Sequence, residues 1–182
     1  MSDDRQKVDA YLEMIQDHVL SPIQGTDLKE SCTATVLLIF GSIDGLGKLT
    51  HPEDLAGAGK RFKWYLRTFM RPEYGTHCDA LYTLRCSLAH NALNFTSFIS
   101  KTRMGEQHHL EFDSTLGYVF VSSAVLTRDF DASLRKLDEE LNKDTKLITR
   151  AASRLHWLED NTYAYWSQFS TPPGPIPFIN LK

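Results

Sequence analysis

The chain has 182 residues, of which 42% are hydrophobic and 24% are charged, and this composition is typical of one soluble globular domain with its own core. The net charge of −3 provides no overall positive field that would attract nucleic acid or an anionic membrane. Three cysteines without a Cys-x-x-Cys spacing argue against a disulfide framework and against structural zinc, and they predict free thiols in a cytoplasmic protein.

The ends of the chain differ in composition from its middle. The N-terminal residues contain no apolar segment of the kind found in signal peptides, and the longest uninterrupted apolar run, Val36 to Phe40, is too short to cross a bilayer. We therefore expect neither a leader nor a membrane segment. Four of the seven prolines fall in residues 171–182, which predicts an extended tail after a single domain over residues 1–170.

Apolar residues three and four positions apart predict a first helix over about residues 4–20, which Pro22 should end because proline cannot donate to the helical ladder. Asp27 followed by Glu30 resembles a capping arrangement and predicts the start of a second helix. This second helix is apolar on most sides and should be the central one. Asp44 lies near its expected end, just before two glycines.

Thr50 and Pro52 predict the start of a third helix, with a hydroxyl cap followed by a proline in the first turn. Its later part has an aromatic face and an opposite, positively charged face. We call the four cations of that face the cationic stripe: Lys60, Lys63, Arg67 and Arg71. Such a stripe would suit an RNA or phosphate ligand, although a solvated helix face commonly has the same composition.

After a predicted loop over residues 71–75, a fourth helix is expected from Cys78 to Leu93. It carries Arg85 and His90, and its packing face should be supplied by Ala80, Leu81, Leu84 and Leu88. Arginine stays charged and can grip phosphate oxygens with a fork of donors. Histidine titrates near neutrality and can act as acid or base. The two residue types together suit phosphodiester chemistry.

The remaining segments complete the predicted fold. Short aromatic and β-branched runs near residues 95–100, 110–112 and 118–121 predict a small antiparallel hairpin or meander after the fourth helix. A helical 3-4 pattern of apolar residues then runs from Phe130 to Leu158 and is broken at Asp144, which favours two helices over one long helix. The expected fold class is a mainly α helical bundle with a small β element.

The segment Leu81-Tyr82-x-Leu84-Arg85-Cys86-x-Leu88-x-His90 resembles the HEPN superfamily, whose hallmark is Arg-x4–6-His on one helix of a helical bundle. With the aromatic helix before it, the resemblance covers about residues 26–93. It implies a metal-independent endoribonuclease of a toxin–antitoxin or defence system that needs no cofactor. It also implies a homodimer, RNA or a nucleotide as ligand, and an antitoxin or nucleotidyltransferase as a further partner.

In this interpretation Arg85 stabilises charge on the phosphate and His90 is the acid or base. Five positions on a helix separate two side chains by about 140° and about 7.5 Å, so a single copy need not bring both to one phosphate. A two-fold pair of copies would supply two of each. Supporting roles are assigned to Asp44, Asp79, Tyr82 and Cys86, and no metal site is predicted.

Two observations weigh against this interpretation. Four other pairs fit the bare pattern, namely Arg71–His77, Arg103–His108, Arg103–His109 and Arg150–His156, and only the last lies in a predicted helix. Cys86 also stands where the family often has a polar residue, and a thiol is a weak hydrogen-bonding partner. The alternative is a non-catalytic interaction or nucleotide-binding protein, in which the apolar pattern from Phe130 to Leu158 binds a partner or a second copy.

Overall fold

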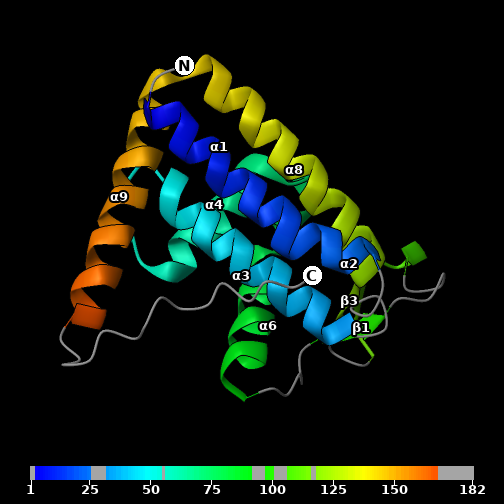
Figure 1. Ribbon diagram of the computed structural model, residues 1–182. Coiled ribbons are helices and arrows are strands. Elements are labelled where there is room, and N and C mark those ends of the chain that lie inside the picture. Colours follow the sequence, from blue (N-terminus) through cyan, green and yellow to red (C-terminus); the bar gives the residue numbers. More distant parts are fainter. Residues whose placement is uncertain are drawn as a thin grey trace.

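The computed structural model describes residues 3–25, 32–54, 56–91, 97–100, 106–115 and 118–167. The elements in chain order are α1 (Asp3–Ile15), a π-helical turn (Gln16–Leu20), α2 (Ser21–Gly25), α3 (Cys32–Thr50), α4 (Ala58–Phe69), α5 (Pro72–Thr76), α6 (Cys78–Asn91), β1 (Ser97–Ser100), β2 (Phe112–Asp113), β3 (Tyr118–Ser122), α8 (Ser123–Lys143) and α9 (Thr145–Ser167). Figure 1 shows α1 and α3 crossing the front of a bundle flanked by α8 and α9, with the small sheet at one edge. The predicted fold class is confirmed.

The central position expected for the second predicted helix is confirmed in α3, which contacts α4, α6, α8 and α9. Its side chains Val36, Ile39, Phe40 and Ile43 are each 0% exposed. Burying an aliphatic or aromatic side chain of this size stabilises a fold by about 1.5–3 kcal/mol. By length and composition alone α3 could also cross a membrane, but core helices of soluble proteins pass the same test.

The expectation that α3 ends near its glycines is wrong, because the helix continues to Thr50. Two of these glycines are sites of close approach. A Cβ at Gly47 would lie 2.7 Å from the carbonyl oxygen of Arg61 on α4, and one at Gly45 would lie 2.9 Å from the Tyr11 hydroxyl on α1. The missing side chain of Gly47 therefore allows α3 to pack closely against α4, and that of Gly45 leaves room for the Tyr11 hydroxyl.

Three predicted boundaries differ from the structure. Pro22 does not end the first helical segment, because it lies in the first turn of α2, where an N–H is not required, after the π-helical turn. The Thr50 hydroxyl donates to the Leu46 carbonyl at 2.7 Å, so Thr50 belongs to the end of α3 and not to the start of α4. A loop is expected over residues 71–75, whereas residues 72–76 form the short helix α5.

The β element has three strands in the order β1-β3-β2. β2 pairs with β3 in antiparallel fashion as expected, whereas β1 runs parallel to β3, so the arrangement is not a meander. Leu110, just before β2, has a φ of 66° and donates its backbone N–H to the Phe120 carbonyl at 2.8 Å. This positive φ is uncommon for leucine and turns the chain into the sheet.

The two C-terminal helices predicted from the break in the apolar pattern are confirmed. Asp144 ends α8 by donating its N–H to the Glu140 carbonyl, and its carboxylate accepts the N–H of Lys146 at 2.9 Å at the start of α9. The apolar side chains of this pattern are buried in the chain's own core: Phe130, Leu134, Leu137, Leu141, Ala151 and Leu155. They are therefore not free to bind a partner. The predicted cap at Asp27 and the tail over 171–182 lie outside the described residues.

A buried polar network joins the sheet to the helices. The His109 Nδ1 accepts the backbone N–H of Ser122 at 3.0 Å, so its Nε2 carries the proton and donates to the Tyr74 hydroxyl at 2.8 Å. Tyr74 in turn donates to the carboxylate of Asp129 at 2.8 Å, and Arg71 pairs with Asp129 at 2.7 Å. Burial, and secondly the charge of Arg71, lowers the pKa of His109 to about 4.

The close approach at Gly47 predicts opposite effects for two substitutions in α3. Gly47→Ala should lower the free energy of unfolding by about 1–3 kcal/mol, because the new methyl group meets the Arg61 backbone. Gly41→Ala should raise it by about 0.5–1 kcal/mol, because no atom lies within 4 Å and alanine favours a helix. Urea denaturation measures both, and equal effects would contradict the assigned contact.

The state of His109 predicts loss of stability in acid. The folded protein protonates His109 only near pH 4, whereas an unfolded chain does so near pH 6.5. Between these values the unfolded state binds more protons, so the free energy of unfolding should fall as the pH is lowered from 6.5 to 4, by at most about 1.4 kcal/mol per pH unit. Denaturation across this range should show a shallower dependence in His109→Gln; an unchanged slope would refute the assignment.

Candidate functional site

α6 is held in the bundle by its apolar face and by one aromatic contact. Leu81, Leu84 and Leu88 are 1%, 0% and 4% exposed, which confirms the predicted packing face. The Tyr82 ring lies so close to Gly59 on α4 that a Cβ there would be 2.9 Å from two ring carbons. Its centroid is 5.7 Å from that of Phe62. α6 is therefore fixed against α4 over its first two turns.

The guanidinium of Arg85 pairs with Asp44 of α3. Arg85 Nη2 donates to Asp44 Oδ2 at 2.5 Å, and the two side chains are 21% and 18% exposed. Burial lowers the pKa of Arg85, but the Asp44 carboxylate and the Cys86 side chain together outweigh burial, and the pKa is raised. Arg85 is thus a permanently charged, half-buried group with a set orientation. The predicted supporting residue Asp44 does lie beside it.

The second oxygen of this carboxylate is also informative. Asp44 Oδ1 is buried and has no hydrogen-bond partner among the described residues. Buried polar atoms are normally satisfied by protein, water or ligand, so Oδ1 can accept a hydrogen bond from a group that is not among the described residues. The Arg85–Asp44 pair therefore offers both a fork of donors and an acceptor at one place.

Cys86 and Tyr82 surround the same arginine. Hydrogen bonding to Cys86, followed by burial, raises the pKa of the Tyr82 hydroxyl, and the Cys86 side chain also bonds to Arg85. The Cys86 side chain therefore contacts both Arg85 and Tyr82, although a sulfur atom is a weak hydrogen-bonding partner. Three of the four predicted supporting residues, Asp44, Tyr82 and Cys86, gather around Arg85.

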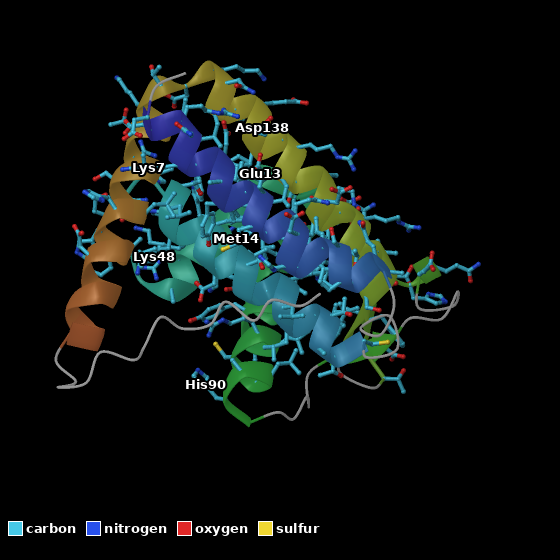
Figure 2. The ribbon with its side chains drawn as sticks, in the orientation of Figure 1. Lys7, Glu13, Met14, Lys48, His90 and Asp138 are labelled. Carbon is cyan, nitrogen blue, oxygen red and sulfur yellow. The ribbon has the colours of Figure 1, made fainter. Side chains whose placement is uncertain are left out.

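His90 lies in the last described turn of α6 and is exposed. Figure 2 shows its side chain near the lower end of α6, directed away from the bundle. Arg85, by contrast, faces α3 through its bond to Asp44. The structure thus does not bring the two predicted catalytic residues to one point within a single chain, in agreement with the helical spacing.

The cationic stripe is largely paired with acids. Lys60 bonds to Glu53, Lys63 bonds to Asp79, and Arg71 pairs with Asp129. The partner of Arg67 is the Cys78 sulfur, at 2.9 Å from Nη2. Three carboxylates thus offset four positive charges, which weakens this face as a binding surface for an RNA backbone. Asp79, predicted to support the arginine helix, instead pairs with the stripe.

The sequence did not predict two clusters of polar side chains. One is the network of His109, Tyr74 and Asp129, whose members lie in three separate segments. The other is at the end of α3, where Arg154 donates to several backbone carbonyl groups. Neither has a signal in local spacing, because each partner comes from a distant part of the chain. Over the described ranges no three His, Cys, Asp or Glu side chains gather closely enough to hold a metal ion.

The Arg85–Asp44 pair predicts strong energetic coupling. Asp44→Ala should lower the free energy of unfolding by about 1–3 kcal/mol, because it leaves a half-buried guanidinium without its carboxylate. The Arg85→Ala, Asp44→Ala double variant should be less unstable than the sum of the singles, by about 0.5–3 kcal/mol. The exposed pair Lys143–Glu140 is the matched control and should show near-zero coupling. If the decrease in the free energy of unfolding of the double variant equals the sum of the two single decreases, the Arg85–Asp44 contact does not contribute to stability.

Comparison with known proteins does not assign the chain to a family. No protein-family model, no curated protein and no solved structure matches it. The resemblance of the Arg85–His90 helix to the HEPN superfamily therefore depends on the residues of this chain alone. The function has to be inferred from the contacts of Arg85, Asp44 and His90.

Proposed function

We propose that the protein is a HEPN-like, metal-independent endoribonuclease that works as a homodimer, with α6 of each copy lining one shared cleft. The observation that carries the proposal is the Arg85–Asp44 pair at 2.5 Å, because it holds a charged guanidinium in one orientation on the helix that also presents an exposed histidine. A role in a toxin–antitoxin or defence system, with an antitoxin or nucleotidyltransferase partner, belongs to the same proposal.

The chemistry would be attack of a ribose 2′-hydroxyl on the adjacent phosphate. This reaction needs a base for the nucleophile, an acid for the leaving 5′-oxygen and positive charge at the phosphate. One chain offers one exposed histidine on α6 and one oriented arginine. Two copies about a two-fold axis offer two histidines, one as base and one as acid, and two arginines for the phosphate oxygens.

A surface beside this helix favours pairing of two copies. α3, which contacts α6, leaves Leu37 and Leu38 at 38% and 37% exposure, and Gly41 next to them has nothing within 4 Å. Large apolar side chains next to an open glycine suit close packing of a second helix. Leu37 and Asp44 lie on the same side of α3, so a copy bound here would lie about two helical turns from the Arg85–Asp44 pair.

A non-catalytic, partner-binding protein is the second candidate, and the pairing of charges favours it. Asp44 compensates Arg85, and carboxylates compensate three of the four stripe cations. Such a surface binds polyanions weakly. If this candidate holds, the exposed Leu37–Leu38 face of α3 is the surface that a partner covers, because the apolar residues of α8 and α9 are already buried.

RNA incubated with the protein in EDTA tests the proposed activity. The parent should cut RNA without metal, and His90→Ala should reduce the rate by about 100-fold or more, the usual contribution of an acid or base. Arg85→Lys keeps the charge but loses the fork, and should also be slow. His156→Ala, an exposed histidine on α9, is the matched control and should cut like the parent.

The proposed dimer is tested by measuring the molar mass of the same protein variants in solution by light scattering. Leu38→Glu should shift the mass toward one copy and abolish cutting, although Arg85 and His90 are unchanged. Intact RNA with the parent, or equal cutting by the parent and His90→Ala, would favour the partner-binding candidate. Cutting by a strictly monomeric protein would overturn the shared cleft.

A further inference from the structure

A cavity of about 590 Å³ lies between the first turns of α9 and the segment that follows α3. Two rows of side chains on α9 line it, each with a spacing of four residues. The first row is cationic, with Lys146, Arg150 and Arg154, and the second carries hydroxyl groups, with Thr145, Thr149 and Ser153. Residues four apart lie on one side of a helix, so both rows face the same space. No residue of this cavity belongs to the Arg85 site.

Hydrogen bonds to backbone carbonyl groups of this chain restrict the side chains of Arg150 and Arg154. Arg154 Nη1 donates to the carbonyl oxygens of Lys48, Leu49 and His51 at 2.9, 3.1 and 2.7 Å. Arg150 Nη1 donates to the carbonyl of Thr50 at 3.1 Å. These bonds satisfy the last carbonyl groups of α3 and also restrict both guanidinium groups. A restrained arginine loses less conformational freedom when it binds an anion.

The charge balance of the cavity is positive, in a chain whose net charge is −3. Its three cations face Asp54, which pairs with Arg154, and Asp144, which caps α9 just outside the cavity. The negative end of α3 and the positive end of α9 each contribute about half a charge and cancel. Asp54 also interacts electrostatically with Arg150, and no carboxylate of the described residues forms an ion pair with Lys146.

We propose that this cavity binds the phosphate group of a small phosphorylated sugar or polyol. The Lys146 ammonium, the Arg150 guanidinium nitrogens other than Nη1 and the aligned hydroxyls are donors that suit a phosphate monoester dianion. Arg154 is already bonded to three carbonyl groups and to Asp54, so it contributes mainly its charge. The hydroxyl row can also bond to ligand hydroxyls, and among the described residues that line the cavity none has an aromatic ring that could stack on a nucleobase. The donors line one open hollow along the first three turns of α9, which suits a compact ligand.

Isothermal titration of the full chain with inorganic phosphate, glucose 6-phosphate and glucose tests the site. Both phosphate-bearing compounds should bind and glucose should not. Lys146→Gln should weaken binding of glucose 6-phosphate by about tenfold, the loss expected for one charged hydrogen bond. Thr149→Val, which removes a hydroxyl without changing charge, should weaken it by about threefold or more. Both residues are exposed, so the variants should unfold at the parent's temperature.

Lys143→Gln is the control, because it removes the same charge at the end of α8, three residues before Lys146 and outside the cavity, and should change affinity by less than about twofold. Equal losses in Lys143→Gln and Lys146→Gln would show diffuse attraction and would overturn the proposal. So would the absence of phosphate binding, or tighter binding of single-stranded RNA that depends on the same residues. None of these results bears on RNA cutting by the α6 site.

Discussion

The packing of α3 against α4 is the contact on which the candidate site depends. Gly47 brings the two helices together at the Arg61 backbone, and Phe40 and Phe62 meet edge to face with centroids 5.4 Å apart. Phe62 in turn contacts Tyr82 of α6. A buried helix thus places α4, and α4 places α6, so that the position of Arg85 is set by core contacts and not by a surface loop.

The Arg85–Asp44 pair has two opposing consequences for function. It fixes the guanidinium in one geometry, which favours recognition of a planar array of phosphate oxygens. It also cancels a positive charge close to where a phosphate would bind. In the proposed homodimer a second copy would add its His90, whereas its Arg85 would bring its own Asp44 with it. A catalytic role would therefore need a rearrangement of this pair, or positive charge from another group, when a phosphate binds.

Polar side chains from distant segments complete the ends of the helices and the edge of the sheet. Arg154 satisfies the carbonyl groups at the end of α3. His109 and Tyr74 connect the sheet to α5 and α8 through Asp129. Because each contact joins separate elements, these groups determine how the helices meet more than how each one forms. The cavity along α9 arises from the same arrangement, since Arg150 and Arg154 both reach the end of α3.

The sequence alone determined the helical class, the packing face of α6 and the division of the C-terminal region at Asp144, because hydrophobic periodicity and capping are local properties. It also identified the helix of Arg85 and His90. Only the tertiary structure decided that α3 continues past its glycines, that β1 runs parallel to β3, and that acids neutralise most of the cationic stripe. A glycine in a sequence usually indicates the end of a helix, but Gly47 lies within α3 and allows close contact with α4. The partners of Arg71 and Arg85 are distant in the sequence. The local spacing of residues cannot predict such partners, because they come together only when complete helices pack against one another.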